Sequence, residues 1–219
     1  MGVVDLDTDK GHVFVRQDWR YEWTNKAGTS PWTIRERNAF HHALDRQIWK
    51  FWSLRLAIKV QRTTEPAPAR IEPWIDRSLS LSFDIRRVLT GGAWTVTATK
   101  VNPASPRDFP RADTTFEARR MQLFSTDTTP HHALRFPYDP MRRPNNDFFV
   151  GPHEFGHALG YGNSRGDGEE YRPENPYFND TLSLMNIGLY VRPRHVRLIV
   201  ETLASMVGGV RFVAAEVPK

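Results

Sequence analysis

Apolar and polar positions in the first third of the chain predict an extended segment followed by a helix. The segment HVFVRQDWRYEW is rich in β-branched and aromatic residues, as is typical of a strand. Ser30 and Pro31 follow it, and serine before proline is a common N-cap and first helical position. Apolar residues then recur at every fourth position, as expected for a helix that packs one face on a core: Phe40, Leu44, Ile48 and Trp52. We therefore expect residues 1–65 to form an N-terminal layer.

Alternating apolar positions in the middle of the chain predict two strands. They occupy every second position in residues 79–85 and again in residues 94–98, with Gly91 and Gly92 between the two segments. A short connection containing glycine predicts an antiparallel hairpin. The segment TFEARRMQLFS supplies a third candidate strand. A proline-rich stretch, TTEPAPARIEP, predicts a surface connection between the N-terminal layer and the rest of the chain. We expect residues 79–125 to form a small mixed or mostly antiparallel sheet, and residues 79–213 to combine this sheet with the catalytic helices.

A short helix is predicted within the stretch VGPHEFGHALGYGN. It should begin between Asp147 and Pro152, because proline is tolerated only in the first turn of a helix. It should end at Gly160 or Gly162, since glycine favours the backbone conformation that follows a helix C-terminus. The stretch thus places the motif H-E-x-x-H on a helix.

The motif carries residues suited to metal-assisted hydrolysis. His153 and His157 lie four positions apart, so both imidazoles project from one helical face and can reach a single cation. Glu154 projects beside them and can act as a general base towards water, while zinc lowers the pKa of that water to ~7 and polarises the scissile carbonyl. The chain has no cysteine, so a zinc site must be built from histidine and carboxylate ligands.

The block HEFGHALG resembles the active-site helix of the zincin metallopeptidases. Met185, in the segment NDTLSLMNIG, resembles the methionine of the turn that metzincins place beneath zinc. The resemblance implies a single α+β zincin-like domain spanning residues 1–219, with a Met-containing turn and a C-terminal helix. Metzincins take their third ligand from the position that Asn163 occupies here, and Asn163 offers only a neutral carbonyl.

Gluzincins instead take a third ligand, a glutamate, from a second helix. The segment VRPRHVRLIVETLASMV predicts a helix of about fourteen residues that begins near Pro193 and includes Glu201. We therefore expect Glu201 to complete the zinc site, although the same periodicity also fits a solvated ion pair between Glu201 and Arg197. The competing ligands are Asn163 and the carboxylates of a glycine-rich loop, Glu169, Glu170 and Glu174.

An oxyanion donor would complete a peptidase site. His195 lies on the same predicted helix as Glu201, near the edge of its apolar stripe, and can donate to the developing oxyanion. Tyr171 and Tyr190 are alternatives for that role.

Residues 79–213 also resemble the metallopeptidase toxin domains attached to VgrG spike proteins of type VI secretion systems. In that group a glutamate well beyond the H-E-x-x-H motif completes the zinc site, and Glu201 lies at about that distance. The resemblance implies an antibacterial effector that hydrolyses proteins or peptides in the periplasm of a target cell. It also implies delivery by a secretion spike and neutralisation by a cognate immunity protein.

Composition limits the other possibilities. The net charge is +5, but the basic residues are interspersed with acidic ones, so we do not expect a nucleic-acid partner. The first twenty residues contain no apolar signal-peptide segment, and no stretch is long and apolar enough to span a membrane. An effector with this sequence would depend on other machinery for export. The alternative function is an inactive zincin-like adaptor module, although such a module would not need the base Glu154.

Overall fold

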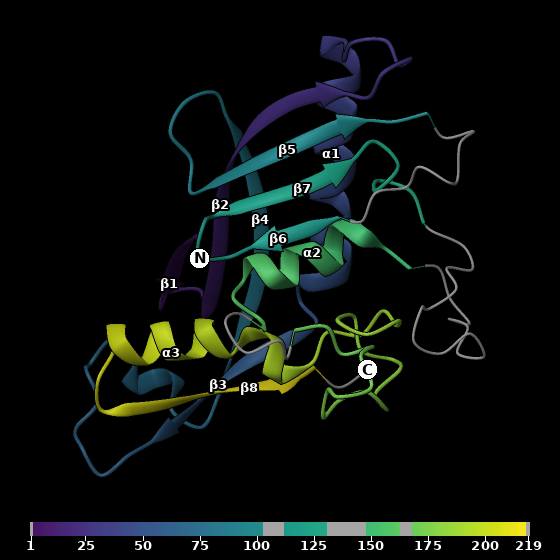
Figure 1. Ribbon diagram of the computed structural model, residues 1–219. Helices are drawn as coiled ribbons and strands as arrows, with labels where there is room; N and C mark the ends of the chain where they lie inside the picture. Colours follow the sequence, from purple (N-terminus) through teal and green to yellow (C-terminus); the bar gives the residue numbers. More distant parts are fainter. Residues whose placement is uncertain (1, 103–111, 131–147, 163–167, 218–219) are drawn as a thin grey trace.

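The computed structural model describes residues 2–102, 112–130, 148–162 and 168–217. Within these ranges the fold is α+β, as predicted: three α-helices pack with an eight-stranded mixed sheet (Figure 1). The strands are β1 (Val3–Asp7), β2 (His12–Asn25), β3 (Leu56–Arg62), β4 (Ser78–Val88), β5 (Trp94–Lys100), β6 (Asp113–Thr115), β7 (Arg120–Phe124) and β8 (Val210–Glu216). The helices are α1 (Ile34–Trp52), α2 (Val150–Ala158) and α3 (Arg197–Met206), with short 3₁₀ turns η1 (Glu72–Trp74) and η3 (Pro193–Val196).

Strand β2 lies at the centre of the sheet. The strand order is β6-β7-β5-β2-β4-β3-β8, and β1 also pairs with β2. β4 and β5 run parallel to β2, whereas β1 runs antiparallel to it. Residues 1–65 therefore supply β1, β2 and β3 to the same sheet as residues 79–213, and the sheet is larger than the sequence predicted.

The predicted hairpin of β4 and β5 is wrong, although both strands form. The two strands lie on opposite edges of β2, and the connection between them crosses β2 near Arg20, which is in register with Val88 of β4. Gly92 makes this close crossing possible. Its φ is +95°, and a Cβ at this position would lie 3.3 Å from the carbonyl oxygen of Asp18. The glycines serve a crossover rather than a hairpin turn.

Helix α1 buries the predicted apolar stripe, but it begins later than predicted. Its N-cap is Thr33 rather than Ser30, because Thr33 and Glu36 form a reciprocal capping box. The Glu36 amide donates to Thr33 Oγ1 (3.2 Å), and the Thr33 amide donates to Glu36 Oε2 (2.8 Å). Ser30 accepts a hydrogen bond from Lys100 Nζ instead.

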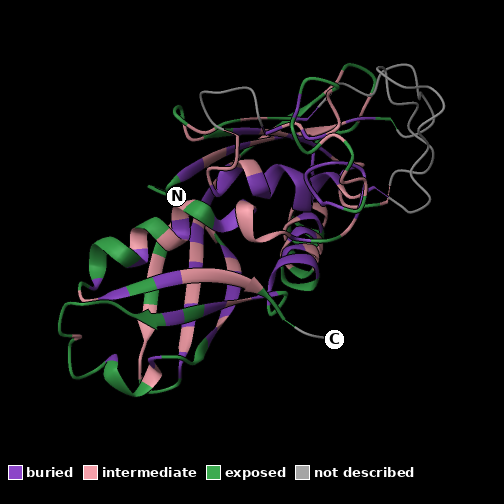
Figure 2. Cartoon of the chain, turned by 90° about the horizontal axis from the view of Figure 1, so that it is seen from below, coloured by how far each residue is buried: buried purple, intermediate pink, exposed green. Residues whose placement is uncertain are grey.

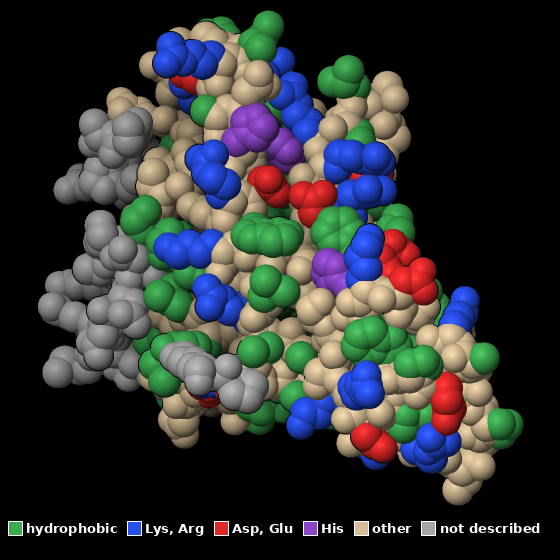
Figure 3. Space-filling model, turned by 180° about the vertical axis from the view of Figure 1, so that it is seen from behind, with side chains coloured by type: hydrophobic (Ala, Val, Ile, Leu, Met, Phe, Trp, Pro, Cys, Tyr) green, Lys and Arg blue, Asp and Glu red, His purple; other side chains and the backbone are tan. Residues whose placement is uncertain are grey.

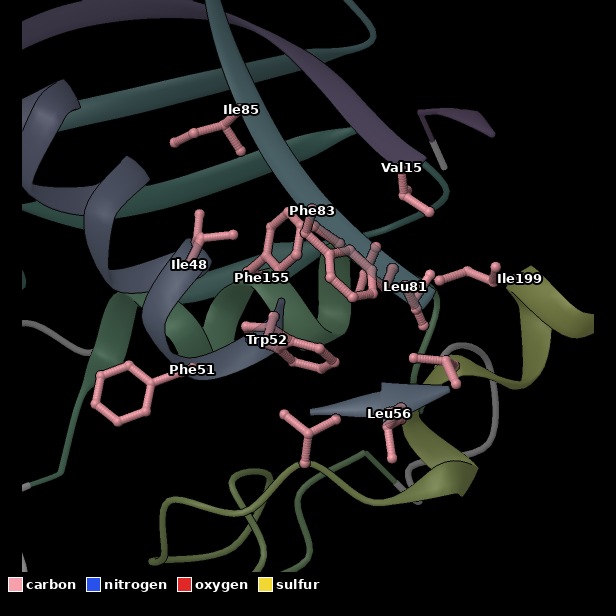
Figure 4. Packing of buried hydrophobic residues seen from close by; sticks show 14 of the residues in the cluster. Val15, Ile48, Phe51, Trp52, Leu56, Leu81, Phe83, Ile85, Phe155 and Ile199 are labelled. Atoms are coloured by element: carbon pink, nitrogen blue, oxygen red, sulfur yellow. The ribbon is translucent and has the colours of Figure 1, made fainter. Parts of the chain in front are cut away.

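Helix α2 is held by aromatic packing from α1 and β4. The rings of Trp52, Phe83 and Phe155 meet with centroids 5.6 to 5.9 Å apart (Figure 4). The Trp52 indole also donates to the Pro152 carbonyl oxygen (2.9 Å). Eight of the nine residues of α2 are buried, and the buried segments gather where the helices meet the sheet (Figure 2). The bounds of α2 agree with the predicted start and end.

The C-terminal helix was also predicted. Turn η3 and helix α3 together span residues 193–206, and the apolar residues Val196, Ile199 and Leu203 form its buried stripe. Among the described residues, no helix is long and apolar enough to cross a membrane. On the face shown in Figure 3, basic side chains alternate with acidic and apolar ones instead of forming one basic patch.

We expect Thr33→Ala to lower the free energy of unfolding by about 1 kcal/mol, because it removes the side-chain acceptor of the α1 capping box. Ser30→Ala is the matched control and should change that free energy by less than about 0.5 kcal/mol, as is usual for surface positions. Urea unfolding followed by tryptophan fluorescence measures both values. Equal losses in the two variants would contradict the assignment of Thr33 as the N-cap.

Candidate metal centre

Two imidazoles and a carboxylate converge beside α2. His153 and His157 project from the helix, and Glu169 reaches them from the loop that follows. His153 Nε2 lies 3.3 Å from His157 Nε2 and 3.2 Å from Glu169 Oε2, while His157 Nε2 lies 3.9 Å from Glu169 Oε1. In the described part of the chain this is the one group of three or more such ligands that could hold a metal ion.

The separation of the two imidazole nitrogens fits a tetrahedral zinc ion. Zinc–nitrogen bonds are about 2.0–2.1 Å long, so two nitrogen ligands at the tetrahedral angle lie about 3.3–3.4 Å apart. The two Nε2 atoms are 3.3 Å apart. Two imidazoles with one carboxylate also form a His₂Glu ligand set, which leaves a fourth position for water or substrate. The residues present therefore fit zinc.

Backbone carbonyls orient both imidazoles towards this point. His153 Nδ1 donates to the Leu184 oxygen (3.0 Å), and His157 Nδ1 donates to the Tyr161 oxygen (3.1 Å). When Nδ1 carries the proton, Nε2 presents its lone pair as a ligand. The donor atoms therefore face a common centre.

Two glycines allow neighbouring segments to approach the histidines closely. A Cβ on Gly156 would overlap the sulfur of Met185, so Met185 packs directly against α2 between the two histidine positions. A Cβ on Gly168 would lie 2.8 Å from His157 Cε1. The absence of side chains at these two positions lets the Met185 turn and the loop bearing Glu169 close around the site.

The electrostatics of the group favour a positive charge at its centre. Burial lowers the pKa of His153, but the hydrogen bond and charge of Glu169 outweigh it, so the pKa of His153 lies above its ordinary value. A proton on His153 thus competes with a metal ion for the same place, and metal affinity should fall in acid.

Glu154 is buried beside the group in a different environment. Burial raises the pKa of Glu154 to about 7, although the positive charge of His153 and a hydrogen bond from Thr114 lower it. That hydrogen bond runs from Thr114 Oγ1 on β6 to Glu154 Oε2 (2.7 Å). A carboxylate with a pKa near neutrality can both take and return a proton at physiological pH. A divalent cation next to it would lower this pKa.

Glu201, the predicted third ligand, does not belong to the group beside α2, where the carboxylate is that of Glu169. The Glu201 side chain is 54% exposed and pairs with Arg197 one turn earlier on α3 (3.6 Å). This is the solvated ion pair that the periodicity of the helix also allowed. Glu201 lies on the solvent-exposed face of α3, whereas the two imidazoles project from α2, so its carboxylate does not reach them.

The other candidate ligands have different settings. Glu170 is fully buried and forms a bidentate pair with Arg194 (2.7 and 2.9 Å). Burial raises its pKa, but hydrogen bonds from Arg194 and His195 hold that pKa well below its ordinary value. Glu174 is exposed. Asn163 lies outside the described residues.

His195 is not placed as an oxyanion donor, and this prediction is corrected. Its side chain is buried, and its Nδ1 accepts a hydrogen bond from the Arg192 amide (3.1 Å). Its Nε2 lies 3.3 Å from Glu170 Oε1, so both ring nitrogens are engaged away from the metal group. Of the two tyrosines, Tyr171 stands beside His153, with ring centroids 6.4 Å apart. Tyr190 is 42% exposed and pairs through its backbone with residues 182 and 184.

Several residues of the site were not predicted from the sequence. Thr114, Tyr161 and Leu184 act through hydrogen bonds to Glu154, His157 and His153, and nothing in their local pattern indicates those partners. Gly168 carried a signal, because a glycine immediately before a candidate ligand permits close approach of the backbone.

A family search, a search of curated proteins and a search of solved structures found no match to this chain. The resemblance to zincins therefore remains a prediction based on the motif. The case for a metal centre rests on the positions of its three side chains.

We expect Glu169→Ala to weaken zinc binding on the order of 100-fold, because it leaves only two imidazole ligands. Glu201→Ala is the matched control and should retain the parental Kd, since Glu201 lies in a solvated ion pair. Competition with a chromophoric chelator at neutral pH measures both constants. A Kd that changes in Glu201→Ala but not in Glu169→Ala would restore the two-helix site.

Proposed function

We propose that the protein is a zinc-dependent peptidase whose zinc is held by His153, His157 and Glu169. The observation that carries the proposal is the pairing of a His₂Glu group with a buried carboxylate on the same helix. The two imidazole nitrogens have the separation of tetrahedral zinc ligands, the Glu169 carboxylate lies beside them, and Glu154 follows His153 directly. A site that only bound zinc for stability would need the ligands but no buried base.

Zinc, when bound, would supply a Lewis acid that polarises a peptide carbonyl and lowers the pKa of water. The protein contributes the geometry. The two backbone carbonyls hold the imidazole lone pairs in place, and Glu169 reduces the net charge of the centre. Two neutral imidazoles and one carboxylate leave a net positive charge to act on the substrate.

Glu154 would act as the general base and acid in this reaction. Its carboxylate would take a proton from the attacking water and deliver it to the leaving amine. Thr114 holds one carboxylate oxygen of Glu154 by a hydrogen bond (2.7 Å), which fixes the rotamer of the side chain. Because β6 carries Thr114, the edge of the sheet helps position the base.

Tyr171 is the favoured donor to the developing oxyanion. It follows Glu169 by two residues, is partly exposed, and its ring lies beside that of His153. A tyrosine hydroxyl can donate to an oxyanion while its ring packs against the site. We assign this role to Tyr171 instead of His195, because both ring nitrogens of His195 contact polar groups in the interior.

We further propose that the peptidase acts as an antibacterial effector that a type VI secretion spike delivers to the periplasm of a target cell. The support is the resemblance of residues 79–213 to spike-borne metallopeptidase toxin domains. A cognate immunity protein would protect the producing cell. Directing the chain to the periplasm or the cytoplasm of a test bacterium distinguishes the compartment of toxicity.

We expect Glu154→Gln to lower peptide hydrolysis by roughly 100-fold or more, because an amide cannot take the proton from water. Zinc content should stay near that of the parent, since Glu154 is not a ligand. The exposed Glu174→Gln is the matched control and should keep full activity. Cleavage of a mixed peptide library, read by mass spectrometry, measures the rate, and elemental analysis measures the zinc.

Undiminished cleavage by Glu154→Gln would contradict the peptidase mechanism. A parent protein that binds zinc stoichiometrically but cleaves no peptide would favour the adaptor module.

A further inference from the structure

We propose that a buried group around Glu170 positions all three side chains of the metal centre. This group, called here the Glu170 frame, consists of Tyr161, Glu170, Ser183, Arg194 and His195. Its members touch no metal ligand atom directly, so their role is one of positioning rather than catalysis. The inference rests on the metal centre proposed above.

Glu170 is the centre of the frame. Its carboxylate is fully buried and accepts hydrogen bonds from Arg194 Nε (2.7 Å), Arg194 Nη2 (2.9 Å) and the hydroxyl of Tyr161. His195 Nε2 lies 3.3 Å away. The backbone of Glu170 is held as well, because its amide donates to the Met185 oxygen (3.1 Å) and its carbonyl accepts from Asn186 Nδ2 (3.1 Å). Both the side chain and the backbone of Glu170 are therefore fixed.

Each metal ligand is connected to this frame by a short path. Glu169 is the residue immediately before Glu170, so fixing the Glu170 backbone fixes the position from which Glu169 reaches the imidazoles. Tyr161 donates its hydroxyl to Glu170, and its own carbonyl accepts from His157 Nδ1. The turn that binds the Glu170 amide through Met185 also offers the Leu184 carbonyl to His153 Nδ1. Glu170 thus connects three separate ligands, one through its carboxylate and two through its backbone.

The frame is also anchored to the outer part of the fold. Arg194 Nη2 donates to Asp180 Oδ2 (2.6 Å), and Asp180 in turn forms a bidentate pair with Arg192. Arg192 reaches Glu216 at the end of β8 (2.9 Å). The loop bearing Glu169 is thereby attached to the sheet as well as to α2.

Ser183, His195 and Glu170 have the residue types of an acyl-transfer triad, but their hydrogen bonds exclude that role. The Arg192 amide donates to His195 Nδ1, so the proton of a neutral ring is on Nε2. Nε2 faces both Ser183 Oγ (3.2 Å) and Glu170, and in that state it cannot take a proton from serine. Ser183 is also fully buried. The hydrogen bonds of Ser183 and His195 therefore fit a role in positioning Glu170.

Arg194→Lys tests the frame, because lysine keeps the charge but cannot form the bidentate pair with Glu170. Its matched control is Arg192→Lys, since both arginines pair with Asp180 but only Arg194 reaches Glu170. We expect Arg194→Lys to weaken zinc binding about tenfold, at the low end of the loss for a direct partner of a metal ligand, because Arg194 acts on the ligands through Glu170. Arg192→Lys should stay within about threefold of the parent on the same grounds.

Co²⁺ absorption provides a readout that general destabilisation does not move. Arg194→Lys should shift the Co²⁺ spectrum towards that of Glu169→Ala, and Arg192→Lys should keep the parental spectrum. Urea unfolding of the metal-free proteins separates stability from affinity. Tyr161→Phe removes only the hydroxyl that reaches Glu170 and keeps the carbonyl that orients His157. If Arg194→Lys does not fold, Tyr161→Phe provides the test instead. We expect it to weaken zinc binding several-fold.

Parental Kd and Co²⁺ spectrum in the folded frame variants would overturn the frame alone, even where their metal-free stability falls. A parent protein that binds neither Zn²⁺ nor Co²⁺ would overturn the metal centre and the frame together.

Discussion

The site depends on the nearly complete burial of α2. A helix of nine residues is not stable alone in water, so its packing against Trp52 and Phe83 holds it in place. Burial brings its polar side chains into an apolar interior, where each one must be hydrogen-bonded or lose stability. His153 and His157 therefore bond to backbone carbonyls, and Glu154 bonds to Thr114. The apolar core thus determines the orientation of the residues that could perform chemistry.

Much of the fold could be predicted because its elements have local causes. Apolar residues occupy every second position in β4 and β5 and every fourth position in α1, because each element buries one face. The sequence shows both patterns. Strand pairing has no such local cause. The connection containing Gly91 and Gly92 suits a hairpin as well as a crossover, and only β2, some seventy positions earlier in the chain, decides between them by pairing with both strands. The sequence therefore predicts β2, β4, β5 and the helices, but not how the strands pair, and it does not predict β1, β3, β6 or β8.

The site shows the same division between local and distant causes. His153, Glu154 and His157 share one helical turn, so their spacing alone indicated that they act together. The third ligand comes from a loop, where no periodicity indicates which way a side chain projects. The resemblance to gluzincins favours Glu201 on the predicted C-terminal helix, yet the apolar stripe of α3 directs Glu201 into solvent. Among the loop glutamates, Glu169 and Glu170 differ only in their burial and in their hydrogen-bond partners. The sequence of two consecutive glutamates predicts neither of these properties.

In the proposed metal centre, these two consecutive glutamates would allow a loop to supply a ligand without a large loss of affinity. A ligand on a mobile loop must be ordered when the metal binds, and ordering a residue costs about 1–2 kcal/mol in backbone entropy. Glu170 is fully buried and hydrogen-bonded through its side chain and backbone, so this ordering occurs when the chain folds. The Glu169 side chain is partly exposed, with 17% of it accessible. Its hydrogen bond with His153 can be replaced by a bond to a metal ion. The buried Glu170 carboxylate fixes the position of the loop, and the Glu169 carboxylate beside it faces the two imidazoles.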